Sequence, residues 1–130
     1  MLKTRRMLIA YPVLGSEGLQ SKISTHFGRA PCFLAVETRD HACQAYATDE
    51  LRADGECAPL RALARLGVRE VHCAHMGRGA LQRCLEHRLQ VFHTTASTVE
   101  AALMARAAGL CPDLPDEALC AGHHDESHHC

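Results

Sequence analysis

The chain contains no tryptophan, and aromatic residues make up only 4% of its 130 residues. Proteins that bind single-stranded nucleic acid stack the bases on aromatic side chains, so this class of function is disfavoured. The formal net charge is −1, which leaves neither a basic field for a nucleic-acid backbone nor an acidic field for a cationic partner. We therefore expect no nucleic-acid partner.

Long hydrophobic runs are also missing. No apolar stretch approaches the roughly 18–20 residues that a membrane-spanning helix needs, so we expect no membrane partner. The N-terminal MLKTRRMLIAYPVLG has basic residues before an apolar run, as a secretory signal peptide does. However, the run Met7–Leu14 is short, Pro12 interrupts it, and no A-x-A-like cleavage site follows. We interpret it as a buried strand of a cytoplasmic protein with reduced thiols, and an export signal as the less favoured alternative.

Cysteine and histidine are abundant, with eight Cys and ten His, and they concentrate in the C-terminal CAGHHDESHHC. Thiolate and imidazole suit zinc, nickel, copper or iron better than magnesium or calcium. The alternative is a solvated tail of biased composition. We expect residues 111–130 to form a flexible metal-binding tail after a domain over residues 1–110. The predicted tail ligands are Cys120, His123, His124, His128, His129 and Cys130.

The remaining chain alternates between strand and helix patterns. Apolar, β-branched segments predict strands at about 7–13, 32–39, 42–48, 68–75 and 89–95. Helical spacing predicts helices at about 57–66, within 76–88, and from a capping box at 97–100 to about 108. Gly67 and Gly109 are placed to end the first and third helices. Strands that alternate with helices favour parallel pairing, and an early hairpin adds antiparallel strands. We therefore predict one α/β domain, a mixed five-stranded sheet with helices on its faces.

Two loops carry residues that could bind a ligand. In STHFGRAPC, Gly28 allows close backbone approach, Arg29 offers a fork for an anion, and His26 and Cys32 are soft donors. Considered alone, this spacing is weak evidence for a binding site, because a lone His or Arg in a loop more often has a structural role.

The second loop is CAHMGRGAL, which runs from a strand end into a helix. Its glycines leave backbone N–H groups at the helix start available to an anion. It is neither a Walker loop nor a dinucleotide-binding fingerprint. We expect Cys73 and His75 to share one face of the strand, with Cys73 a buried apolar residue and His75 close to a ligand. Cys84, on an apolar helical stripe, is expected in the core, and Cys111 could join the tail's metal site.

The chain offers no convincing catalytic arrangement. No carboxylate pair is spaced for acid–base chemistry, and no serine nucleophile elbow is present. A magnesium-dependent nuclease would need several acids at strand ends, and the predicted strands supply only Glu37 and Glu70. We therefore predict no catalytic residues and a protein that is not an enzyme.

The segments STHFGRAPCFLAVE, GVREVHCAHMGRGALQRCLEHRLQVF and STVEAAL resemble the dinitrogenase iron–molybdenum cofactor biosynthesis family, the domain of NifX, NafY and the NifB C-terminal region. The resemblance covers about residues 7–110. It implies a ribonuclease H-like fold and non-catalytic binding of an anionic metallocluster, an iron–molybdenum cofactor or an iron–sulfur precursor. The chain departs from the family pattern at Cys32, at Ala74-His75 and at Gly79.

The resemblance implies a nitrogenase accessory protein whose partners are the metallocluster and cofactor-assembly proteins. The alternative is a zinc, nickel or copper chaperone or sensor that acts through the tail. The expected cluster-binding residues are His26, Phe27, Gly28, Arg29, Cys32, His75, Met76, Gly77, Arg78 and Gly79.

Overall fold

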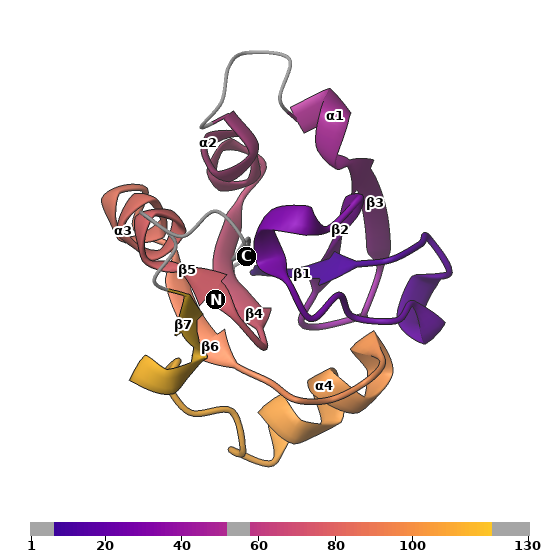
Figure 1. Ribbon diagram of the computed structural model, residues 1–130. Helices are drawn as coiled ribbons and strands as arrows, with labels where there is room; N and C mark the ends of the chain where they lie inside the picture. The colour runs from indigo at the N-terminus through magenta and orange to yellow at the C-terminus, as the bar shows by residue number, and fades with distance from the viewer. Residues whose placement is uncertain (1–6, 52–57, 121–130) are drawn as a thin grey trace, which may run out of the picture.

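The computed structural model describes residues 7–51 and 58–120. Its main sheet has five strands in the order β3-β2-β1-β4-β6, as Figure 1 shows. These strands are β1 (Leu8–Val13), β2 (Cys32–Glu37), β3 (Cys43–Ala47), β4 (Val68–Cys73) and β6 (Gln90–His93). β1 pairs antiparallel with β2 and parallel with β4, while β2–β3 is antiparallel and β4–β6 is parallel. The predicted mixed five-stranded sheet is confirmed.

Helices cover the two faces of the sheet unequally. The helices α1 (Thr48–Leu51), α2 (Ala58–Arg65) and α3 (Arg78–Glu86) contribute to one core, and α4 (Val99–Ala107) lies on the opposite face (Figure 1). The first core contains Leu51, Leu60 and Cys84. The second places Val99 and Leu103 of α4 against strand residues. Among the described residues, α4 packs mainly against β1 and β2, and no second helix packs on this face in the core cluster.

The helix ends follow local chemistry. Thr98 caps α4, because its side-chain oxygen accepts the Ala101 N–H at 3.2 Å. Gly67 and Gly109 follow α2 and α4 with φ of 104° and 75°, the left-handed conformation that favours glycine. Both predicted helix ends are confirmed. The polar segment after β3 begins with the short helix α1.

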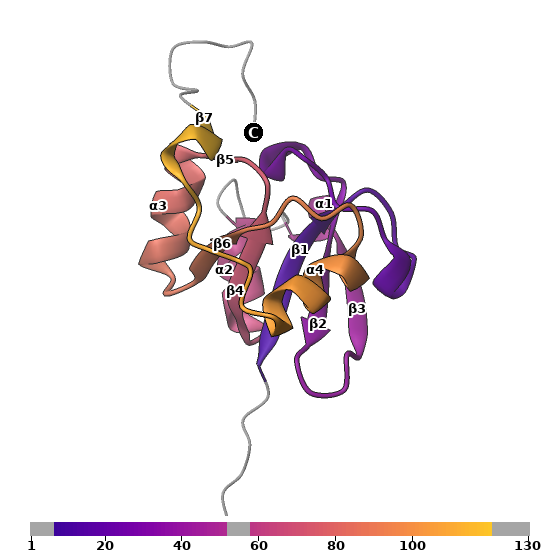
Figure 2. The same ribbon diagram turned by 90° about the horizontal axis from the view of Figure 1, so that it is seen from below.

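Residues 111–120 make contacts with the domain. The His93 N–H donates to the Pro112 carbonyl at 2.7 Å, and Ala118 is buried. The short strands β5 (Met76–Gly77) and β7 (Leu119–Cys120) pair in parallel, with Gly77 opposite Cys120. Figure 2 shows both at one end of the main sheet. The backbone of Cys120, the first predicted tail ligand, thus lies beside the glycine-rich turn.

No helix among the described residues is long and apolar enough to cross a membrane.

Candidate functional site

The two predicted ligand-binding loops meet at the carboxyl end of β4. The Phe27 N–H donates to the His75 carbonyl at 3.3 Å, and His75 Nδ1 lies 3.3 Å from the Thr25 carbonyl oxygen. A carbonyl oxygen only accepts, so this hydrogen bond requires the proton on Nδ1. In the neutral ring, Nε2 of His75 then carries the free lone pair. The carboxyl end of parallel strands is the usual ligand crevice of α/β sheets.

The imidazole rings of His26 and His75 stack. Their centroids are 6.2 Å apart and the ring planes differ by 27°. Both residues are exposed. His26 is held from its own loop, where its N–H donates to the Ser24 hydroxyl oxygen at 3.2 Å, and Ser24 itself is buried. Two exposed nitrogen-donor side chains from separate loops are thereby brought together.

Each of these histidines precedes a buried apolar anchor. Phe27 follows His26 and packs its ring against Phe33 at 5.2 Å, and Met76 follows His75 and is fully buried. Both anchors belong to the core cluster on the α2 and α3 face. The rigid core therefore fixes the backbone on which the two imidazoles are displayed, as a preorganised binding site requires.

The loops around the histidine pair carry positive charge. Residues 22–31 and 74–80 contain Lys22, Arg29 and Arg78 and no Asp or Glu. Arg29 and Arg78 are exposed. Gly77 precedes α3 and provides no side-chain cap. The first N–H groups of α3, at the positive end of the helix dipole, are therefore available to a ligand. The space where a Gly77 side chain would lie has no heavy atom within 4 Å. This arrangement suits an anion that also accepts nitrogen ligands.

The other predicted pocket residues lie around this centre. Gly28 is within the short 3-10 helix Phe27–Arg29, and a side chain at Gly79 would lie 3.5 Å from Arg83 Nη1. Cys32 begins β2 at the same sheet edge, but its thiol donates to the Val13 carbonyl at 3.8 Å. It packs with the core cluster on the α4 face, whereas Phe27 and Met76 belong to the other cluster.

The expected common face of Cys73 and His75 is wrong, because β4 ends at Cys73 and the chain turns before His75. Cys73 is fully buried, as expected, and so is Cys84. Burial raises the pKa of both thiols to about 12, so they behave as small apolar groups. Neither is a ligand to the exposed loop site.

Of the predicted tail ligands, Cys120 lies in β7, and the others lie outside the described residues. Within residues 7–51 and 58–120, no group of three His, Cys, Asp or Glu side chains is arranged around a metal position. The tail as a metal site therefore stays a prediction.

A second polar cluster was missed by the sequence reasoning. Glu70 and His72 lie on the α4 face of β4, with Glu70 Oε1 2.9 Å from both His72 Nε2 and Arg106 Nε. Arg106 Nη2 also donates to Glu70 Oε2 at 3.1 Å. Burial opposes ionisation, but the hydrogen bonds from His72 and Arg106 outweigh it and lower the pKa of Glu70 to about 2. The Glu-x-His spacing within the predicted strand was the available signal, since it puts both side chains on one face.

The structure is a small α/β domain in which two loops bring cationic side chains and two exposed imidazoles together at one end of the sheet. The model of the dinitrogenase iron–molybdenum cofactor family matches residues 7–109. The chain belongs to this family, which confirms the resemblance seen in its sequence.

Solved structures share the fold. The apo form of the orange protein from Desulfovibrio gigas is similar at 22% identity with a TM-score of 0.72, over 85% of this chain and 95% of that one. A candidate NifB protein from Thermotoga is similar at 23% identity with a TM-score of 0.70, over 82% and 91%. A candidate dinitrogenase from Methanocaldococcus jannaschii is similar at 14% identity with a TM-score of 0.60, over 85% and 97%. No curated protein matches the chain.

Proposed function

We propose that this protein is a non-catalytic, cytoplasmic carrier that binds an anionic iron–molybdenum or iron–sulfur cluster, or its precursor, at the edge where its two loops meet. The stacked pair of His26 and His75 carries this proposal, because it gathers two exposed imidazoles from loops that are distant in sequence. Membership of the iron–molybdenum cofactor family supports the nature of the cargo. In this role the protein works with cofactor-assembly proteins as an accessory of nitrogenase or of a related metalloenzyme.

The donor set fits such a cargo. His75 Nε2 has a free lone pair and can bind a metal atom at the cluster surface, since Nδ1 is engaged by Thr25. The guanidinium groups of Arg29 and Arg78 and the N-terminus of α3 provide charge and hydrogen bonds for cluster sulfides or oxo groups. The lack of carboxylates in both loops avoids repulsion of an anion.

The tail contributes a separate ligand set in this proposal. The backbone of Cys120, its first predicted ligand, pairs with Gly77 at the start of α3. We expect the tail to bind a transition-metal ion and to assist loading, whereas the folded domain retains the cluster.

The test is anaerobic reconstitution of the full-length chain with iron, sulfide and molybdate, followed by metal analysis and visible absorption. We expect a coloured, metal-containing protein. A full-length variant with all six tail donors replaced by Ser should still become coloured, although more slowly. H26A and H75A should bind the cluster more weakly and be less coloured, while H87A, which changes a histidine at the end of α3, should keep the wild-type colour. Loss of all metal from the tail variant alone would contradict the proposal and identify the tail as the binding site.

A further inference from the structure

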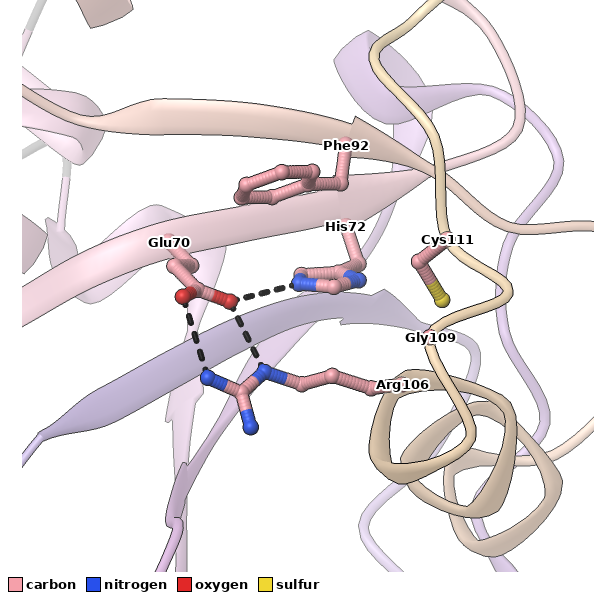
Figure 3. Close-up of a pocket in the computed structure, with 6 residues that line it drawn as sticks. All are labelled: Glu70, His72, Phe92, Arg106, Gly109 and Cys111. Atoms are coloured by element: carbon pink, nitrogen blue, oxygen red, sulfur yellow. Dashed lines mark hydrogen bonds and ion pairs between the residues drawn. The ribbon is translucent and has the colours of Figure 1, made fainter.

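A pocket of about 300 Å³ lies on the α4 face of the sheet. It is lined by residues of β4 and β6, by Arg106 of α4 and by the segment that follows α4. After Gly109 the chain turns in a left-handed conformation, which brings Cys111 to the pocket wall. Figure 3 shows the six lining residues, which are Glu70, His72, Phe92, Arg106, Gly109 and Cys111.

His72 presents an unpartnered nitrogen in this pocket. The residue is 1% exposed, and its Nδ1 has no hydrogen-bond partner among the described residues. In Figure 3, this nitrogen lies on the side of the ring that faces Cys111. A buried polar atom without a partner costs about 1–3 kcal/mol and therefore indicates something that binds it.

The neighbours of His72 determine which of its nitrogens can bind a ligand. Both carboxylate oxygens of Glu70 accept hydrogen bonds from Arg106, and Oε1 lies 2.9 Å from His72 Nε2, so this ring nitrogen carries the proton and donates it to Glu70. Nδ1 of the neutral ring then carries a lone pair. A carboxylate that orients a histidine through its other nitrogen is the usual support of a metal-binding histidine. Phe92 fixes the ring further, with centroids 5.0 Å apart.

Cys111 supplies a soft donor next to this lone pair. Its thiol is half-buried, and burial is the main reason why its pKa is raised. A soft metal ion that binds this sulfur displaces the thiol proton. The hydroxyl of Tyr11 is also buried without a partner among the described residues, and its ring lies 5.6 Å from that of His72.

We propose that His72 and Cys111 form a second site, separate from the loop edge, that binds one soft monovalent metal ion such as Cu(I) between His72 Nδ1 and the Cys111 thiolate. On binding, the Cys111 S–H bond breaks, a sulfur–metal bond forms, and the proton passes to solvent. One positive charge enters as another leaves, so the net charge of the pocket does not change.

Charge and donor number favour a monovalent ion over zinc. The charges of Glu70 and Arg106 already cancel in their paired hydrogen bonds. A zinc ion with one thiolate would leave an excess positive charge, and structural zinc takes four ligands. Thiolate selects Cu(I), which is stable with two donors. The pocket's volume is also at the lower end of the range for small-molecule sites.

The experiment must separate this pocket from the tail and from the loop histidines. It uses the full-length chain with the six tail donors replaced by Ser, titrated anaerobically with Cu(I) against a chromogenic chelator. The ring nitrogens of His72 are followed by long-range proton–nitrogen NMR, which reports on this one residue. We expect the Nδ1 resonance of His72 to shift with the first equivalents of Cu(I), while Nε2 stays protonated.

C111S should bind one equivalent less Cu(I), or bind it at least a hundredfold more weakly, and its His72 resonances should no longer respond. C43S is the matched control, because Cys43 is also half-buried with a pKa raised by burial, and it should bind as its parent does. Thermal unfolding checks that both variants are folded. If C111S does not fold, the NMR response of the parent chain decides alone. Unchanged His72 resonances at every Cu(I) ratio would overturn the proposal. The pocket would then be interpreted as a site for water or for an organic ligand.

Discussion

The rings of His26 and His75 stack with centroids 6.2 Å apart, although the two residues come from different loops. The relationship depends on the buried residue that follows each histidine, Phe27 and Met76. Because these anchors belong to one core cluster, the backbones that carry the two imidazoles cannot move apart without disturbing that core. The core therefore determines where the two histidines lie relative to each other.

If both histidines contact one ligand, their contributions to binding are coupled. We predict that H26A and H75A each weaken cluster binding at least tenfold. The double variant should bind little more weakly than either single variant, because the first replacement already removes the shared contact. Equilibrium transfer of the cluster to a chelator measures these affinities. Additive losses would indicate two independent contacts.

The cationic residues of the loop site should contribute through charge. R29Q and R78Q are each expected to weaken binding about two- to fivefold, since exposed ion pairs contribute about 0.2–1 kcal/mol. The effect should shrink as salt is raised, because the charges are screened. R65Q, on an exposed residue of α2, is the control and should bind like the wild type. An effect of R29Q or R78Q that does not depend on salt would argue against an anionic cargo.

The pair of Glu70 and Arg106 predicts a dependence of stability on pH. The pKa of Glu70 falls from 4.5 to about 2 on folding, so its stabilisation is complete above pH 4.5 and is lost as the pH falls towards 2. E70Q should lower the free energy of unfolding at pH 7 by roughly 2 kcal/mol. This is less than the full pKa shift would give, because 31% of the Arg106 side chain is exposed.

Urea unfolding between pH 2 and pH 7 measures this dependence. The difference between wild type and E70Q should be constant above about pH 5 and should narrow below pH 4.5. The exposed residue Glu86 of α3 provides the control, since E86Q should follow the wild-type curve. A constant difference down to pH 2 would show that Glu70 acts through packing and not through its charge.

Local patterns in the sequence were enough to predict the sheet, because its strands and helices have clear periodicities. The hairpin of β2 and β3, the parallel β4–β6 pair and the glycines that end α2 and α4 followed from these patterns. The proximity of His26 and His75 could be suspected only from the family resemblance, because no local pattern links their loops.

The cluster at Glu70 depends on long-range contacts. Arg106 lies in α4, and nothing near it in the sequence indicates that its partner is Glu70 of β4. Cys111 appeared to belong to the tail, but the turn at Gly109 places it beside His72. Side-chain networks between distant elements leave no periodicity, so only the three-dimensional structure identifies them.

The apolar stripe of α2 gives a prediction about stability. Leu63 is fully buried in the core cluster, whereas Leu66, at the end of the same helical segment, is 42% exposed. L63A should lower the free energy of unfolding by about 3 kcal/mol, because it leaves a cavity in a packed core. L66A should lower it by less than about 1 kcal/mol. Chemical denaturation of both variants checks this, and equal losses would mean that α2 packs differently.

The turn after α2 gives the last prediction. Gly67 has a φ of 104°, and a side chain there would meet only Leu8 Cδ1 at 3.7 Å, an ordinary contact. Any destabilisation of G67A therefore comes from the backbone conformation, and we expect a loss of about 1–2 kcal/mol. At Gly15 a methyl group would meet no heavy atom within 4 Å, and φ is not positive, so G15A should be neutral or slightly stabilising. If thermal unfolding finds both variants equal to wild type, α2 does not require a left-handed residue to end.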